Sequence, residues 1–341
     1  MNELLIGLLS ALVATNAPLA VSNLVQKKTG LALPITNRQD PLSQAVQKLM
    51  TEDDAAQAEV DDWILERQKA ERKESEVEKA AFRAKILHRF EPVKKGYEAF
   101  LESHPDHAEA LLAYGSFLND IGEEEAAEKL WEKARVADPK NPAAWNNLAN
   151  HFGHYGDVKK AFDYYSKSIE LDSNESLYYQ NLATTVFLFR KDAMEHYQIT
   201  EPEVFRKAME LYRKALALDP DNFRLAAEVA QTYYGITTPK EVDAAARAKA
   251  ERQLADEAMA AWQTALKLAE DDLQRGSVHL HLTRWHIKRG EFDEAHRVLN
   301  LVTNEALAPS KKNLTRHLAE KEKGKGKEPL PPPGRALESL P

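Results

Sequence analysis

The residues of this chain best suited to binding another molecule are amides that recur along its middle. They are Asn119, Asn146, Asn147, Asn150, Gln180 and Asn181. An amide group both donates and accepts hydrogen bonds, so a row of amides can hold the backbone of an extended peptide with little demand on its sequence. If the middle of the chain is helical, as argued below, their spacing puts them on one exposed inner side. The same spacing adds four further polar residues, which are Glu228, Gln231, His281 and Arg284.

A purely structural role for these amides stays open as the alternative. An asparagine beside a repeated leucine, as in Asn147 and Asn181, is also ordinary usage in helical repeats.

Histidines are the other residues that could do chemistry, but their spacing does not form a metal site. His151 and His154 lie three residues apart, and His279, His281 and His286 cluster further along. Neither group has a zinc spacing with an acidic catalyst, and the chain has no cysteine to supply thiolates or disulfides. The sequence also lacks a glycine-rich phosphate loop, a serine elbow and a paired-carboxylate signature. We therefore predict no enzymatic activity, no metal and no cofactor.

A spacing of 34 residues indicates which elements would position the amides. One unit consists of Leu111, Tyr114, Gly115, Leu118, Gly122, Ala127, Trp131, Ala134 and Pro139. The matching positions 34 residues later are Trp145, Leu148, Ala149, Phe152, Gly156, Ala161, Tyr165, Ser168 and Ser173. These are the large, small, aromatic and turn residues of a helix–turn–helix unit.

The chain resembles the tetratricopeptide repeat family from about Pro92 to Ala306. The resemblance implies an all-α, right-handed helix–turn–helix solenoid of about five repeats that serves as a docking surface for a protein or peptide. Members that clamp a C-terminal carboxylate use lysine and arginine on successive first helices. Leu112 and Ala113 stand where such groups would be needed, so we do not expect that clamp here.

The repeat register divides the chain into segments. The small residue of each second helix is Ala127, Ala161, Ala208, Ala258 and Ala295. This register predicts a solenoid over 92–306, made of a half repeat 92–107, two regular repeats 108–141 and 142–175, two longer repeats 176–222 and 223–272, and a last repeat 276–306. A linker and helical cap over 29–91 would precede it, and a capping helix with a disordered Lys/Gly/Pro tail over 307–341 would follow.

The two longer repeats carry insertions in their inner turns, near Arg190 to Glu203 and near Ile236 to Gln253. Thr200 and Glu203 have the spacing of a capping box at the end of the first insertion. Stacking of adjacent repeats is expected to bring the insertions to one edge, which would offer aromatic anchors to a partner. The candidates are Phe187, Phe189, Tyr197, Tyr233 and Tyr234. The alternative, that the extra turns only pack on one another, stays open.

The N-terminal segment 1–28 contains an uncharged stretch from Leu4 to Val25, close to the length of a membrane helix. Glu3 precedes the stretch and Lys27 and Lys28 follow it, which favours a cytoplasmic position for the repeats if it inserts. Three interpretations stay open: an anchor or membrane-contact helix over residues 4–25, a helix buried in the protein or an oligomer, and a cleaved export signal.

The formal net charge of −8 argues against nucleic acid as the main ligand, because nucleic acid requires a concentrated basic surface. We predict a non-catalytic interaction scaffold that binds a peptide or protein partner through the groove, the inserted edge or both. The alternative is a structural subunit of a membrane-associated assembly. A membrane-associated location is favoured, with soluble cytoplasmic or exported locations as alternatives. The partner, the pathway and the oligomeric state are not encoded in any motif found.

Overall fold

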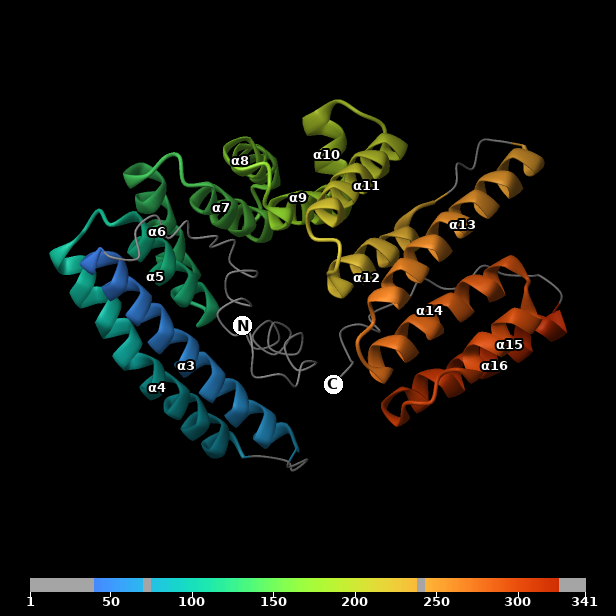
Figure 1. Cartoon of the computed structure of the whole chain (residues 1–341), viewed down its shortest axis with the longest axis horizontal. Coiled ribbons are helices and arrows are strands. Elements are labelled where there is room, and N and C mark those ends of the chain that lie inside the picture. Colours follow the sequence, from blue (N-terminus) through green and yellow to red (C-terminus); the bar gives the residue numbers. More distant parts are fainter. Residues whose placement is uncertain (1–39, 70–74, 238–242, 325–341) are drawn as a thin grey trace. The chain divides into compact units, whose positions relative to one another are not determined.

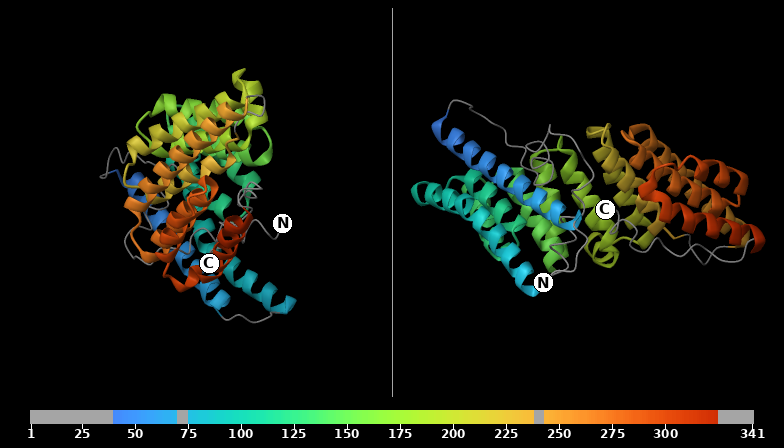
Figure 2. Two further views of the ribbon diagram at one scale, coloured as in Figure 1. Left: turned by 90° about the vertical axis from the view of Figure 1, so that its right-hand side faces the viewer. Right: turned by 90° about the horizontal axis from the view of Figure 1, so that it is seen from below.

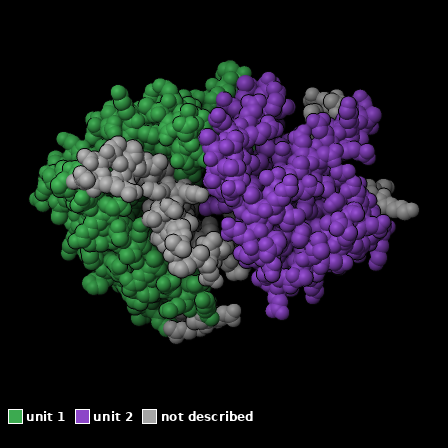
Figure 3. Space-filling model, in the orientation of Figure 1, with its two compact units in different colours: residues 1–198, 335–341 green, residues 199–334 purple. Residues whose placement is uncertain are grey.

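The computed structural model describes residues 40–69, 75–237 and 243–324. Within these residues the chain forms fourteen α-helices and two short 3₁₀ turns, with no β-strand (Figure 1). The predicted all-α repeat architecture is therefore confirmed. The chain divides into two compact units, residues 1–198 with 335–341 and residues 199–334 (Figure 3).

The first unit contains three pairs of neighbouring helices followed by two further helices. The elements are α3 (Pro41–Lys69), α4 (Glu76–Ser103), α5 (Ala108–Asp120), α6 (Glu124–Ala137), α7 (Pro142–Tyr155), α8 (Val158–Leu171), α9 (Ser176–Leu188) and α10 (Arg190–Tyr197). Helix α3 packs on α4, α5 on α6, and α7 on α8. The first helices of successive pairs also contact one another, α3 with α5, α5 with α7, and α7 with α9. We call these four helices the inner row of the first unit.

The ends of the helices follow from local chemistry. The side chain of Asn141 caps α7 by accepting a hydrogen bond from the backbone N–H of Ala143 at 3.0 Å. Pro142 then occupies the first turn, where its missing N–H costs no helical hydrogen bond. The helix ends at Gly156, whose φ of 111° is a conformation that side chains with a Cβ rarely adopt. The turn glycines of the 34-residue pattern therefore have a direct conformational role.

The small and aromatic positions of the pattern form the core between paired helices. Ala127 and Ala161 are fully buried, and the aromatic rings of Trp131 and Tyr165 are almost fully buried beside them. A Cβ atom at Gly115 would lie 2.5 Å from Nε1 of Trp131, so α5 and α6 approach closely only because this residue is glycine. The close packing predicted from the repeat pattern is thus present.

The N-terminal boundary of the array differs from the prediction. Helix α4 runs without a break from Glu76 to Ser103, through Pro92, where the sequence suggested that a half repeat begins. Pro92 is exposed, so the backbone carbonyl that its ring leaves without a helical partner can bond to water. Helices α3 and α4 form a complete pair, and α3 takes the position of a first helix beside α5. Tyr97 of α4 stacks on Tyr114 of α5, with ring centroids 5.2 Å apart.

The second unit has the elements α11 (Glu201–Leu218), α12 (Phe223–Thr232), η1 (Tyr233–Gly235), α13 (Ala244–Leu268), α14 (Asp272–Arg289), α15 (Phe292–Asn300), η2 (Glu305–Leu307) and α16 (Ala308–Gly324). Figure 2 gives two further views of these helices. Helix α12 packs on α13, α13 on α14, and α14 on α15, while α16 closes the end against α14 and α15. The predicted capping box is present, because Thr200 and Glu203 each bond to the other's backbone or side chain at the start of α11. Helix α16 lies within 307–341, where the sequence predicted a capping helix.

Two predicted segments lie outside the described residues. They are the uncharged stretch within 1–28 and the tail after Gly324. None of the helices in the described ranges is both long enough and apolar enough to span a bilayer.

Candidate binding surface of the inner helices

Polar side chains of the inner row are joined from one repeat to the next. Asn147 of α7 donates from Nδ2 to Oγ of Ser116 on α5 at 3.3 Å. Asn181 of α9 donates from Nδ2 to Oδ1 of Asn146 on α7 at 3.0 Å. These two bonds tie α5 to α7 and α7 to α9, so the amides fix the spacing of the inner helices.

Burial separates the predicted groove residues of the first unit into two classes. Asn146 and Asn147 are buried, and Nδ2 of Asn146 has no hydrogen-bond partner within the described residues. Asn119 is exposed, whereas Asn150, Gln180 and Asn181 are half-buried. The half-buried amides are partly engaged as well, since Asn150 accepts a hydrogen bond from the Tyr165 hydroxyl at 2.6 Å. Four of the six amides are thus accessible, while the two buried ones serve the contact between helices.

The formal charge on helices α5, α7 and α9 of the inner row is entirely negative. Helices α5, α7 and α9 contain no lysine or arginine, and their only acidic residues are Glu109 and Asp120. Lysines and arginines stand instead on paired helices of the outer side, such as Lys129 and Arg135 on α6. A ligand that approaches the inner row of this unit therefore meets amides and carboxylates, which favour a neutral or basic partner.

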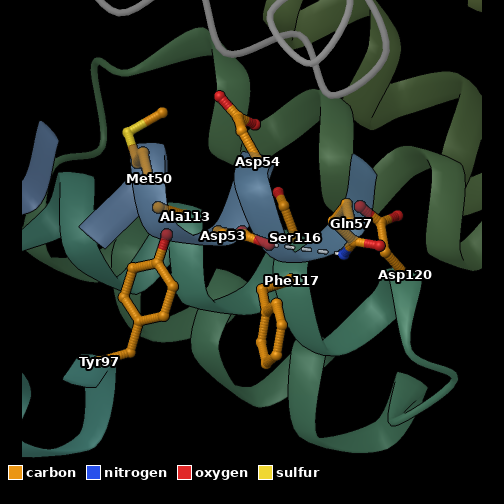
Figure 4. A pocket seen from close by; sticks show the side chains of 9 residues that line it. All are labelled: Met50, Asp53, Asp54, Gln57, Tyr97, Ala113, Ser116, Phe117 and Asp120. Carbon is orange, nitrogen blue, oxygen red and sulfur yellow. Dashed lines mark hydrogen bonds between the residues drawn. The ribbon is translucent and has the colours of Figure 1, made fainter. Parts of the chain in front are cut away.

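A small pocket opens where α3, α4 and α5 meet (Figure 4). It is lined by Met50, Asp53, Asp54, Gln57, Tyr97, Ala113, Ser116, Phe117 and Asp120. Burial, together with the charges of Asp120 and Asp54, raises the pKa of Asp53 to about 8. Burial also raises the pKa of Asp54. We call this feature the acidic pocket.

Tyr97 forms the floor of the acidic pocket. Its side chain is completely buried, and its hydroxyl, which is turned toward α3 in Figure 4, shares a hydrogen bond with the Asp53 carboxyl. Burial and the neighbouring charge of Asp53 raise the pKa of Tyr97.

The acidic pocket was missed by the sequence prediction. The sequence predicted only a linker and helical cap over 29–91, because nothing local shows that α3 lies against α5. The sequence feature that could have revealed the pocket is the adjacent pair Asp53 and Asp54, because the same helix also buries Val46, Met50 and Ala56.

The predicted groove residues of the second unit are mostly engaged within the fold. Glu228 on α12 accepts a hydrogen bond from the Tyr212 hydroxyl at 3.0 Å, and Gln231 on the same helix is half-buried. His281 is buried and stacks on Trp262, with centroids 4.0 Å apart and planes inclined by 7°.

The contacts of His281 point to packing. Its Nδ1 lies 3.1 Å from the Tyr234 hydroxyl and 3.3 Å from Nη1 of Arg284. Burial first, and then the Arg284 charge, holds the pKa of His281 well below its usual value, so the ring stays neutral. The described residues contain no cluster of histidine and acidic side chains with the geometry of a metal site.

Aromatic residues of the first insertion pack against the unit that carries them. Tyr197 of α10 contacts Phe162 of α8, with centroids 5.4 Å apart, and Lys159 of α8 pairs with Glu195 of α10 at 2.7 Å. Phe187 lies beneath the Arg190 guanidinium at 5.4 Å, and Phe189 is half-buried. This insertion therefore has a packing role in the structure.

The second insertion belongs to the other unit, and residues 238–242 of it lie outside the described ranges. Tyr233 is buried, and Tyr234 stacks on Trp285 with centroids 5.0 Å apart. The expectation that the two insertions share one edge stays a prediction.

The helix pairs, the buried small residues and the 34-residue spacing can be compared with known families at this point. A sequence model described as tetratricopeptide repeat matches residues 108–151, the first regular helix pair and most of the next inner helix. The chain contains a tetratricopeptide repeat over these residues. No curated protein gives a significant match to it.

Several solved structures are similar to this chain. The pilF structure from Pseudomonas aeruginosa has 19% identity and a TM-score of 0.49, over 71% of this chain and 95% of its own. Part of a TPR repeat-containing protein from Cytophaga hutchinsonii has 13% identity and a TM-score of 0.49, over 80% of this chain and 98% of its own. YrrB, described as a TPR protein with an unusual peptide-binding site, has 14% identity and a TM-score of 0.46, over 66% of this chain and 97% of its own. At such low identity the likeness concerns the fold and transfers no function.

Proposed function

We propose that this tetratricopeptide repeat protein is a non-catalytic interaction scaffold whose inner row in the first unit binds an extended peptide segment of a partner protein. The observation that carries the proposal is the accessible amide surface formed by Asn119, Asn150, Gln180 and Asn181 on three successive inner helices. Hydrogen bonds from one inner helix to the next hold this surface in shape before a ligand arrives. Such preorganisation reduces the ordering cost of binding.

The inner row is a better candidate than the inserted edge. The aromatic side chains proposed as anchors at that edge are used in packing, as Tyr197 is against Phe162 and Tyr234 is against Trp285. Anchors that dominate binding energy must be free to enter a partner's pocket. The exposed amide of Asn119 needs no such rearrangement.

The experiment begins with a selection of random linear peptides displayed on phage against the purified full-length protein. A photo-crosslinking amino acid is then placed at Asn119 or His154, two exposed positions on the inner helices α5 and α7. Matched positions on the outer helices are Lys129 of α6 and Glu170 of α8, which are also exposed. We expect the selected peptides to crosslink from the inner positions and not from the outer ones.

Competition with an unlabelled copy of the same peptide should abolish the inner crosslinks, because a specific site saturates. Equal crosslinking from inner and outer positions would contradict the proposal. A micromolar dissociation constant, about −8 kcal/mol, is the affinity expected of a surface of this kind.

A further inference from the structure

Arg284 of α14 carries a positive charge that no acidic side chain neutralises within the described ranges. The residue is half-buried, and a cation in such a position is usually paired with a carboxylate. Arg289 on the same helix follows this rule, because it forms ion pairs with Asp256 and Glu291. The contacts of Arg284 are instead with two side chains that carry no charge, those of Tyr234 and His281.

These neutral contacts hold the guanidinium of Arg284 in place. Its Nη1 lies 3.3 Å from Nδ1 of His281, and the imidazole nitrogen accepts the hydrogen bond, because a guanidinium only donates. Arg284 also donates to the Tyr234 hydroxyl. The two partners are themselves fixed by stacking, His281 on Trp262 and Tyr234 on Trp285. The guanidinium is therefore positioned in advance, while its charge is left uncompensated.

The charge of Arg284 extends to α16, which packs on α14. Burial lowers the pKa of His317 on α16, and the charges of Lys321 and Arg284 lower it as well, against the opposing charge of Glu320. The region around Arg284 thus keeps a positive potential at neutral pH, and such a potential attracts an anion.

The number of cations selects the kind of anion. A guanidinium presents parallel N–H groups that match the two oxygens of a carboxylate, and its single charge balances the charge of one carboxylate. The other basic residue available from the neighbouring inner helix α12 is Arg224 in its first turn, ten residues before Tyr234. That separation corresponds to about 15 Å along a helix. A single acidic side chain therefore fits the site better than a chain end held by cations from two helices.

We propose that Arg284, held by Tyr234 and His281, binds the carboxylate of an aspartate or glutamate side chain in a partner protein. The site belongs to the second unit and goes beyond the amide surface of the first unit, on which it does not depend. The inner helices α5, α7 and α9 favour a neutral or basic ligand, whereas Arg284 selects an acidic one.

The first test uses the wild-type full-length protein and needs no variant. Phenylglyoxal, which modifies arginine side chains, is applied at low salt, and peptide mass spectrometry follows the reaction at Arg284 and at the exposed Arg224. The probe is pentaglutamate with both ends blocked. At about four times its dissociation constant, it should slow the modification of Arg284 about fivefold and leave that of Arg224 unchanged.

Two further probes identify the source of the carboxylate. Pentaglutamine with blocked ends has no carboxylate, and pentaglutamine with a free C-terminus has one at its chain end only. We expect neither peptide to protect Arg284. Protection by the free C-terminus alone would overturn the assignment to an acidic side chain, and protection by the blocked peptide would show that the site does not recognise charge.

The second test measures the binding of fluorescein-labelled pentaglutamate by fluorescence anisotropy. Arg284→Gln should weaken binding about tenfold, and Arg284→Lys, which keeps the charge without the planar fork, should weaken it less. The matched control Arg224→Gln removes the same charge from an exposed position of α12 and should stay within about twofold of the wild-type affinity. Circular dichroism verifies that each variant remains helical.

An equal loss of affinity in Arg284→Gln and Arg224→Gln would overturn the inference, because general positive charge would then explain the binding. Unchanged modification of Arg284 in the presence of pentaglutamate would overturn it without recourse to any variant. The amide surface is tested with other peptides and at positions of the first unit, so the failure of one proposal leaves the other standing.

Discussion

Replacement of Asp53 by asparagine tests directly whether the acidic pocket holds a strained carboxyl group. The wild-type side chain has a pKa of about 8 in the folded protein, against the ordinary value of 3.8. The folded state therefore keeps a proton that the unfolded state releases between about pH 4 and pH 8. Raising the pH through this window favours unfolding, by about 1.4 kcal/mol per pH unit. Asparagine does not titrate, so the variant escapes this penalty.

The gain in the free energy of unfolding that Asp53→Asn should give at neutral pH follows from the same pKa shift. About three pH units separate the ordinary pKa from pH 7, which sets an upper value of about 4 kcal/mol for this gain. With allowance for relaxation around the carboxyl, we expect about 3 kcal/mol. Packing should change little, because the carboxyl of Asp53 accepts a long bond of 3.5 Å from Gln57 and a further bond from Tyr97, and asparagine retains a side-chain oxygen. With an m-value of about 2 kcal/mol/M in urea, the expected rise in the unfolding midpoint is about 1.5 M.

The assay is urea unfolding of the full-length protein at pH 5 and pH 7, followed by hydrogen exchange in peptides from α3 to α5. Peptide resolution is needed because two units need not unfold in a single transition. The advantage of Asp53→Asn should be about 2–3 kcal/mol larger at pH 7 than at pH 5. Asp62→Asn, an exposed change on the same helix, should give no such difference. Parallel stability curves for wild type and Asp53→Asn would refute the reasoning, because Asp53 would then ionise as an ordinary aspartate.

Three further predictions concern the repeat framework. Gly115→Ala should lower stability by about 1–3 kcal/mol in urea unfolding, because its Cβ would meet the ring of Trp131. The matched Gly153→Ala has its nearest contacts at 3.9 Å and should be neutral or slightly stabilising; equal losses would argue against the close approach. Thr200→Ala should lower the free energy of unfolding by about 1 kcal/mol and increase hydrogen exchange in the first turn of α11. Unchanged exchange would show that the capping box does not stabilise this turn. Tyr197→Ala should accelerate hydrogen exchange in α10 while α5 stays protected. Unchanged exchange in α10 would show that the packing of the Tyr197 ring does not stabilise this helix.

The sequence determined the helical framework because repeat packing is largely local. The alternation of large and small residues defines the buried face of each helix, so the buried positions of Ala127, Trp131 and Tyr165 could be predicted. The turn glycines and the capping box act within a few residues and were equally visible. The start of the array could not be predicted in the same way, since α3 pairs with α4 without the repeat's characteristic residues.

The binding surface depended on the tertiary structure. Helical spacing placed Asn147 and His281 on an inner side, but only the packing of neighbouring helices showed that both are buried. Spacing within one helix cannot tell how closely the next repeat approaches. The acidic pocket is the clearest case, because Asp53 and Asp120 are far apart in the sequence and meet only where α3 lies beside α5. A raised carboxyl pKa requires burial and neighbouring charge together, and the folded arrangement of α3, α4 and α5 supplies both.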